Sequence, residues 1–320
     1  MNESDQKDFK DPPLFDDEIS IIEIFNIVWE GKKLIILITS IFAIFSVVYS
    51  LNLPNYYLSE SVLVSRDAQD SSALSRYSGL ASIAGVSLPS SGSDPVIEMM
   101  EIIKSREFVK HLITFDNVLP SMMAVKSYDA VSQELFFDPK IYNAKTKTWT
   151  REPIKTKDSK PSYLEAHKSY LGGMLSIYQD KKTNLVHISV EHISPVFARD
   201  FLTLIIKEAN ALKRKKDIDS SGKALNYLKE GLSNTPLMEI KESINQLIEG
   251  QLETQMMAKI NEEYSLVIIE PPFVPEIKSK PSRAITCILI TMVGGMLSLG
   301  IVLIRHYLSG EEKINKRSIV

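Results

Sequence analysis

Two long apolar runs dominate the pattern of hydrophobic and polar positions along the chain. Residues 34–53 and residues 284–304 contain no charged side chain. A helix of about 20 apolar residues crosses the roughly 30 Å of hydrocarbon in a bilayer. A core helix of a soluble protein normally keeps a polar stripe at this length, and neither run has one. The pattern predicts transmembrane helices at 33–53 and 284–304, with a large water-soluble region between them.

The flanks of the two runs predict how the chain lies in the membrane. More than 30 residues precede the first run and no clear A-x-A site follows it, so we interpret it as a retained anchor rather than a cleaved signal peptide. Basic residues at the outer ends of the runs favour cytoplasmic termini, 1–32 and 305–320, by the positive-inside rule. These residues are Lys32, Lys33, Arg305, Lys313, Lys316 and Arg317. Residues 54–283 would then lie outside the membrane.

The first 53 residues contain two further patterns. Residues 1–18 are polar and charged and include two prolines, which predicts disorder. Residues 19–29 are amphipathic, and two interpretations stay open for them. They form either a helix along the membrane surface or a helical extension of the first span.

The region after Pro54 mixes strand and helix patterns, which predicts an α+β base. Alternating apolar positions predict strands at 56–65, 184–193 and 265–270. Asp94 before Pro95 is a good helix start and predicts a helix over 95–112. A second helix is expected over 163–175, and a Ser, Gly and Ala-rich loop over 65–94. The base is therefore expected to comprise residues 54–193 and 262–270.

Residues 195–261 carry the longest helical periodicity of the chain. Ser194 followed by Pro195 is typical of a helix start, and apolar residues then recur at helical spacing to Leu232. The turn at residues 233–236 is followed by a second amphipathic helix. Two such helices joined by a short turn predict an antiparallel hairpin. Because one hairpin would leave apolar surface uncovered, we expect a homo-oligomer.

The last stretch before the second run is rich in proline. Residues 271–281 are expected to form a stiff, extended connector, because proline blocks regular structure. Its prolines are Pro271, Pro272, Pro275 and Pro281. Within the second run, Gly294, Gly295 and Gly300 are candidates for close helix packing or contact with a partner, although their spacing is not GxxxG.

No catalytic, cofactor or metal motif is found in the sequence. The phosphate loop GxxxxGK[ST], the GxSxG elbow and HExxH are all missing. His187 and His192 are five residues apart and point to opposite faces of a strand, so they are a poor metal pair. The basic run Lys213, Arg214, Lys215 and Lys216 is interpreted as a solvated helix face, with contact to an anionic glycan or a lipid-linked pyrophosphate as the alternative. We expect a protein without enzymatic activity.

Charge and cysteine content bear on two further questions, the presence of a nucleic-acid partner and of disulfide bonds. The formal net charge is -3, and no basic surface interleaved with aromatic residues stands out, so a nucleic-acid partner is not expected. The single cysteine, Cys287, lies inside the second apolar run. The region between the runs therefore has no disulfide and must be stabilised by its core.

Four segments together resemble the Wzz-type chain length determinants, also called polysaccharide co-polymerases. They are ISIIEIFNIVWEGKKLIILITSIFAI at 19–44, IEMMEIIKSREFVKHLI at 97–113, NLVHISVEHISPVFARDFLTLIIKEAN at 184–210 and EYSLVIIEPPFVPEIKSKPSRA at 263–284. Their order and spacing and the two-span layout carry the resemblance, which extends from about Ile19 to Ile304. No single motif decides it.

The resemblance implies properties that the residue pattern does not show. Proteins of this type lie in the inner membrane of Gram-negative bacteria and form ring-like oligomers with a periplasmic base and a long-helix trunk. They set the length of a surface polysaccharide, often lipopolysaccharide O-antigen, that a separate polymerase makes from a lipid-linked glycan. Some relatives end in a cytoplasmic tyrosine kinase domain. This chain ends sixteen residues after its second run, so we expect the short form.

Two alternatives to O-antigen length control stay open. The first is a component of capsule or exopolysaccharide export that works with a separate kinase. The second is a two-span membrane sensor, which needs a larger cytoplasmic output segment than residues 1–32 or 305–320 provide.

Overall fold

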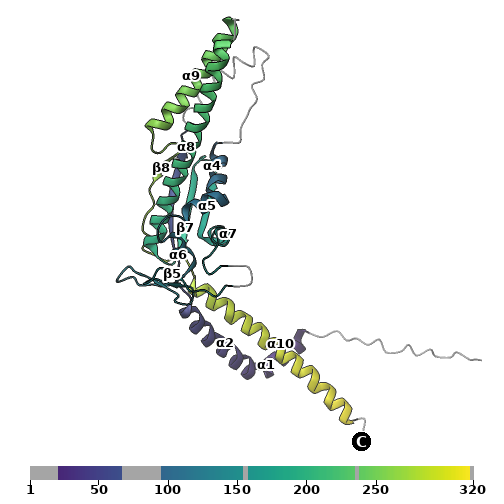
Figure 1. The fold of residues 1–320 in the computed structure, drawn as a ribbon. Coiled ribbons are helices and arrows are strands. Elements are labelled where there is room, and N and C mark those ends of the chain that lie inside the picture. The colour runs from purple at the N-terminus through teal and green to yellow at the C-terminus, as the bar shows by residue number, and fades with distance from the viewer. Residues whose placement is uncertain (1–20, 67–94, 154–157, 235–237, 318–320) are drawn as a thin grey trace, which may run out of the picture. The chain divides into compact units, whose positions relative to one another are not determined.

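The computed structural model describes residues 21–66, 95–153, 158–234 and 238–317. The predicted disorder of 1–18, residues 67–94 of the predicted loop and the Asp94 cap lie outside these residues. Contacts divide the chain into two compact units (Figure 1). Unit 1 comprises residues 1–53 and 281–320, and unit 2 comprises residues 54–280.

The described part of unit 1 contains three helices, α1 (Ile21–Glu30), α2 (Lys32–Asn52) and α10 (Arg283–Arg317). A single residue, Gly31, separates α1 from α2. Both α1 and α2 pack against α10. In Lys32–Asn52 and Arg283–Leu308 the structure has two helices long and apolar enough to cross a membrane.

The exposure of these two helices distinguishes them from core helices. Only 11% of the apolar window in α2 and 17% of that in α10 is buried. Their large side chains face outward, as at Ile44 and Ile288, which are 68% and 65% exposed. A helix that is apolar all round and still exposed favours a lipid environment.

Unit 2 contains a four-stranded antiparallel sheet with the order β6-β7-β1-β8. The strands are β1 (Tyr57–Ser65), β6 (Leu175–Gln179), β7 (Val186–His192) and β8 (Leu266–Glu270). In β7 every second residue from Val186 is buried, which is the pattern of a strand with one covered face. Leu63 pairs with Val186, and Ile177 pairs with Ile188. These side chains lie on the covered face.

Two helices cover that face of the sheet. The first half of α8 (Pro195–Asn234) contacts β1 and β7, and α4 (Pro95–Lys104) contacts β6 and α8. The core between them is apolar and fully packed. It includes Leu63, Met99, Ile103, Ile188, Phe201, Leu202, Ile205 and Ile206.

The second half of α8 packs along α9 (Met238–Ile260), and Figure 1 shows the two helices side by side. The predicted helix start is confirmed at Pro195, and Gly222 does not interrupt α8. Ser233 and Asn234 of the predicted turn are instead the last residues of α8, and residues 235–237 lie outside the described part.

Short elements fill the rest of unit 2. The helical ones are α5 (Arg106–Leu112), α6 (Val118–Met123), α7 (Tyr163–Ser169) and the π-helical turn η1 (Tyr170–Met174). Two small hairpins are formed by β2 (Val125–Tyr128) with β3 (Leu135–Phe137) and by β4 (Tyr142–Asn143) with β5 (Thr148–Trp149).

Two sequence predictions were wrong in this region. The helix expected over 95–112 is broken at Ser105, which is extended and whose hydroxyl accepts a hydrogen bond from the backbone N–H of Phe108. A serine cap of this kind begins a new helix. The helix expected over 163–175 ends at Ser169. The π-helical turn that follows it contains Gly173 at a φ of 142° and leads into β6.

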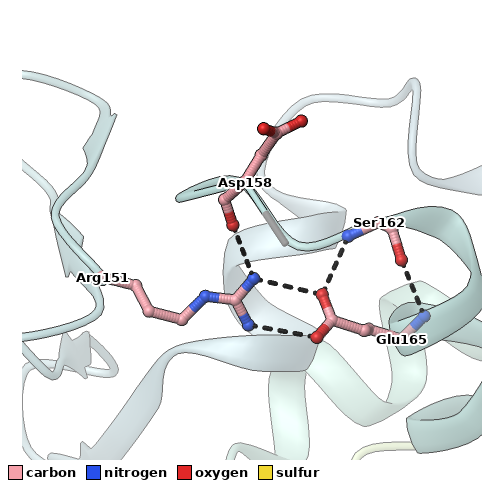
Figure 2. A network of polar contacts seen from close by, with 4 residues as sticks. All are labelled: Arg151, Asp158, Ser162 and Glu165. Carbon is pink, nitrogen blue, oxygen red and sulfur yellow. Dashed lines mark hydrogen bonds and ion pairs between the residues drawn. The ribbon is translucent and has the colours of Figure 1, made fainter. Parts of the chain in front are cut away.

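A polar network fixes the start of α7 (Figure 2). The guanidinium of Arg151 donates two hydrogen bonds to the carboxylate of Glu165, at 3.1 and 3.4 Å, and one to the carbonyl of Asp158. Glu165 and Ser162 also form a capping box. Because these bonds connect both sides of residues 154–157, they tie the β4–β5 hairpin region to α7.

A buried histidine organises the start of α8. One ring nitrogen of His192, Nε2, lies 2.9 Å from the carbonyl of Ser121, and Nδ1 accepts from the backbone N–H of Ser194. The ring is therefore neutral, with the proton on Nε2. Ser194 in turn accepts from the N–H of Phe197 and caps the helix. His192 is therefore a buried residue with structural partners on both ring nitrogens.

Candidate functional site

Helices α2 and α10 approach each other closely at Gly294. A Cβ added to Gly294 would lie 2.5 Å from the Cβ and the Cγ of Phe42, nearer than real Cβ contacts allow. The same holds at Gly31, where an added Cβ would lie 2.5 Å from Val302 Cγ1. Glycine at these two positions therefore lets the helices pack closely.

Helices α2 and α10 together are called the span pair. Its buried positions are mostly small and polar. Ser46, Ser50 and Ser298 are 1%, 2% and 0% exposed. The hydroxyl groups of Ser46 and Ser298 donate to carbonyls of their own helices, those of Ala43 and Gly295. Gly294 and Ser298 are four residues apart, so they form the small-xxx-small spacing of membrane helix contacts. A search limited to glycine missed this spacing.

The other two candidate glycines are open. Apart from its chain neighbours and the nearby backbone of α10, a Cβ added to Gly295 or Gly300 would have no heavy atom of the described residues within 4 Å. The three glycines thus differ in environment. Gly294 is used within the chain, whereas Gly295 and Gly300 leave the surface of α10 accessible to another helix.

The proline-rich connector is held along β1. Its residues Pro271, Pro272 and Pro275 lie outside regular structure in unit 2, and Pro281 lies at the start of the second segment of unit 1. Two serines of β1 hold its first half, since Ser61 donates to the carbonyl of Glu270 and Ser59 to that of Phe273. The connector is fixed to the sheet at these points.

The end of the connector pairs with the beginning of unit 2. The backbone of Tyr56 donates to the carbonyl of Lys280 at 2.9 Å, and its carbonyl accepts from Ser279 at 2.8 Å. The ammonium of Lys280 also lies 2.8 Å from the carboxylate of Glu191 in β7. The first and last residues of unit 2 are therefore held together.

The basic run lies on α8, and two of its four cations are paired locally. Lys213 and Lys216 contact the carboxylate of Glu98 in α4 at 3.2 and 2.8 Å, and Lys213 also contacts Asp217. The hydrogen bond from Lys216 and the two positive charges lower the pKa of Glu98 despite its partial burial. Burial acts to lower the pKa of Lys213, but its bonds to Asp217 and Glu98 outweigh this, and that pKa is raised.

The remaining cations of the run differ from this pair. No ion pair joins Arg214 or Lys215 to a residue in the described part of the chain, and Lys215 is exposed. Within the described residues, these two cations of the run are therefore without a local carboxylate partner.

One buried polar residue that the sequence did not single out joins α8 to β8. The side-chain amide of Asn210 donates to the carbonyl of Leu266 at 2.9 Å. Its carbonyl oxygen accepts from the backbone N–H groups of Ser265 and Leu266, both at 2.9 Å. Asn210 is 3% exposed and therefore satisfies three backbone groups where the chain returns from α9 into the sheet.

The polar clusters of the described residues have structural partners rather than an open reaction centre. No group of three or more His, Cys, Asp or Glu side chains there is placed to hold a metal ion. The carboxylate of Glu165 is engaged by Arg151 and by its own helix cap (Figure 2). His187 stacks on Tyr178 on the sheet face opposite to that of His192.

Comparison with known families gives the first part of the chain an identity. Residues 17–114 match the family described as Wzz, chain length determinant protein. This segment resembles a Wzz domain. It includes α1, α2, β1, α4 and α5, so it joins one candidate span to the central strand and two helices of unit 2.

Solved structures provide a second comparison for this chain. A full-length bacterial polysaccharide co-polymerase is 14% identical and covers 91% of this chain and 99% of its own, with a TM-score of 0.38. A fragment of WzzB, the polysaccharide co-polymerase from Salmonella Typhimurium, is 13% identical and covers 71% and 100%, with a TM-score of 0.27. No curated protein sequence matches. Both TM-scores lie below 0.5, so neither structural likeness carries an argument, and the resemblance to the family depends on the match over residues 17–114.

Proposed function

We propose that this protein is a non-enzymatic regulator of the chain length of a surface polysaccharide, with lipopolysaccharide O-antigen as the first candidate. The observation that carries the proposal is the Wzz match over residues 17–114. The protein acts as an oligomeric scaffold in the bacterial inner membrane for a separate polymerase and its growing lipid-linked glycan. Both termini are cytoplasmic, and residues 54–283 form the periplasmic part.

The span pair supports the membrane part of this proposal. Large apolar side chains face outward from α2 and α10, while small residues lie between the helices. This is the arrangement expected where lipid surrounds the helices, because large apolar groups gain nothing there by turning inward. The two helices anchor the chain, and the bilayer is their solvent.

The α8–α9 pair supports the oligomer. Apolar side chains of α9 remain uncovered within one chain, among them Met238, Leu247, Met256 and Ile260, which are 80%, 56%, 55% and 69% exposed. Exposed large apolar side chains such as these are available for contact with a partner. A second copy of the chain, whose own α9 is uncovered in the same way, covers these side chains. This favours a homo-oligomer with contacts along the α8–α9 pair.

Two surfaces are assigned to partners. The open glycines Gly295 and Gly300 of α10 are the positions where a helix of the polymerase packs closely. Contact with an anionic glycan or lipid-linked pyrophosphate falls to Arg214 and Lys215, because Glu98 engages the other two cations of the run.

Deletion of the gene tests the proposal directly. Surface polysaccharide from the wild type, the deletion strain and the complemented strain is separated by gel electrophoresis. A regulator gives a modal length that disappears on deletion and returns on complementation. An O-antigen ladder of unchanged length distribution contradicts the O-antigen assignment, and a simultaneous loss of high-mass capsule would favour export of a capsule or exopolysaccharide instead.

Variants of α9 test whether control of chain length requires the oligomer. Replacing Leu247 and Met256 by lysine is expected to dissociate the oligomer in detergent, measured by mass photometry, and to abolish modal length. Replacing Lys241 and Lys259 of the same helix by glutamine is the matched control, expected to leave both unchanged. Normal length control by a monomeric variant would exclude the oligomeric scaffold.

A further inference from the structure

Unit 1 contains a crevice that the proposed function does not use. It has a volume of about 380 Å³ and lies where α1, the turn at Gly31 and the start of α2 meet the end of α10. In Figure 1, α1 lies beside α10, and contacts between the two helices agree with this. The close approach of Gly31 to Val302 forms part of its lining.

The lining of the crevice is divided chemically. Ile27, Leu34 and Val302 contribute apolar surface. The remainder is polar and charged and comes from the residues around the start of α2 and from those that follow the apolar run of α10. It comprises Glu30, Lys33, Arg305 and His306. A site of this size with apolar walls and a few convergent charged groups fits a small amphipathic ligand.

The position of the crevice along the helices sets the kind of ligand. Lys33 comes directly before the apolar run of α2, and Arg305 directly follows that of α10. Both charges therefore mark the same end of the apolar stretch, at the level where lipid head groups lie. An occupant at this depth has its tail in hydrocarbon and its polar part among these charges.

The signs of the charges select among head groups. Lys33 and Arg305 suit a phosphate, since both donate charge-assisted hydrogen bonds. Glu30 opposes a purely anionic ligand but suits an ammonium that carries N–H donors. We propose that the crevice binds the head group of a zwitterionic phospholipid with a primary amine, phosphatidylethanolamine, with the phosphate at Lys33 and Arg305 and the ammonium at Glu30. The inference depends on the membrane insertion in the proposed function and goes beyond it.

Other occupants match the lining less well. The quaternary ammonium of phosphatidylcholine has no N–H to donate to Glu30. Phosphatidylglycerol leaves the Glu30 carboxylate without a cation from the ligand. Free phosphate leaves the apolar wall of Ile27, Leu34 and Val302 in contact with water.

Binding of short-chain lipids to the full-length protein tests the selectivity. The delipidated protein in detergent is titrated with dioctanoyl forms of the three phospholipids and with inorganic phosphate, and bound lipid is counted by native mass spectrometry. We expect one saturable site that prefers the ethanolamine lipid about fivefold or more over the other two, a difference of one charge-assisted hydrogen bond. Equal binding of all three, tightest binding of phosphatidylglycerol, or saturable binding of free phosphate overturns the proposal.

Charge variants test the assigned contacts. Replacing both Lys33 and Arg305 by glutamine is expected to weaken binding of the ethanolamine lipid about tenfold or more. Glu30→Gln is expected to remove the preference for ethanolamine over choline while leaving the choline lipid unchanged. Lys32→Gln is the matched control, because the ammonium of Lys32 lies 4.5 Å over the ring of Trp29 and this residue does not line the crevice. A Lys32→Gln effect equal to that of the double variant overturns the assignment.

Failure of the lipid-binding proposal can be distinguished from failure of the proposed function. Lipid selectivity is measured on the wild-type protein in detergent and needs no polysaccharide. Selective binding by a protein without length control contradicts the proposed function alone. Length control by a membrane-inserted protein without selective binding contradicts the crevice alone.

Discussion

In unit 2 the buried positions are occupied by large apolar residues such as Phe201 and Ile188, whereas in the span pair they are occupied largely by Ser46, Ser50 and Ser298. At the exposed positions of α2 and α10 the side chains are instead large and aliphatic. In water, burial of apolar area drives folding. In lipid this force is missing, and close contact of small residues replaces it.

The comparison predicts which substitutions damage each region. In unit 2 the costly changes leave buried polar groups unpaired or charged. In the span pair they add volume between the helices. The four predictions below test this difference, from the largest expected effect to the smallest.

Asn210→Leu should have the largest effect. The change leaves the N–H groups of Ser265 and Leu266 and the carbonyl of Leu266 without their partner in a buried setting. An unpaired buried group costs about 1–3 kcal/mol, so we expect a loss of about 4 kcal/mol, or about 8–16 °C in the midpoint of thermal unfolding. Hydrogen exchange of β8 peptides measures the loss. Asn226→Leu, an exposed position of the same helix, is the control, and a similar effect of both variants would contradict the role of Asn210.

The buried His192 should make unit 2 sensitive to acid. Burial lowers the pKa of His192 from 6.5 to about 4. As the pH falls, His192 therefore binds a proton in the unfolded chain before it does so in the folded chain. The stability that the neutral ring contributes is complete above pH 6.5 and is lost as the pH falls towards 4. The loss approaches about 3 kcal/mol below pH 4, at 1.36 kcal/mol per pKa unit.

The measurement is the unfolding free energy of unit 2 by hydrogen exchange between pH 7 and pH 4. His192→Gln should flatten this dependence, although it is less stable at neutral pH. His187→Gln, on the opposite face of β7, should keep the slope of the wild type. An unchanged slope in His192→Gln would assign the acid sensitivity to other groups.

Gly294→Leu should separate the span pair at a cost of about 1–3 kcal/mol, because the new side chain collides with Phe42. Cysteine crosslinking between α2 and α10 in membranes measures the separation. Gly295→Leu is the matched control, since its Cβ meets open space. Adding Phe42→Ala to Gly294→Leu should restore crosslinking. If Gly294→Leu packs normally, the two helices do not approach each other at this residue.

Tyr170→Phe should have the smallest effect and the opposite sign. The Tyr170 hydroxyl is buried and has no hydrogen-bond partner among the described residues, and burial raises its pKa. Removing it should stabilise unit 2 by about 1 kcal/mol, or about 2–4 °C. Tyr178→Phe at an exposed position should change the midpoint little. A destabilised Tyr170→Phe variant would show that the hydroxyl has a partner in the native protein.

The sequence predicts the elements whose pattern is local. The strand at 184–193 and the helix that starts at Pro195 are found in the structure because alternation and a Ser-Pro start are both readable over a few residues. The sheet order is different. It depends on β1 pairing with β7 and β8, which are far away in the chain, and no local pattern gives that pairing.

The errors have equally local causes. The helix expected over 163–175 ends early because Gly173, at a φ of 142°, redirects the chain into β6, which pairs with β7. Of the candidate site, the sequence identifies Gly294 but not its contact with Phe42, which arises between two spans separated by about 240 residues. Asn210 was missed because an asparagine within an amphipathic helix resembles any solvated position.

The pairing of Tyr56 with Lys280 places the two ends of unit 2 next to each other. Residues bridged in an antiparallel ladder have Cα atoms about 5 Å apart, so a linker of a few residues can close the gap. Residues 54–280 are therefore suited to transplantation into a surface loop of a soluble host, or to circular permutation with new termini at a loop of the original domain. Either format would deliver the water-exposed part without detergent.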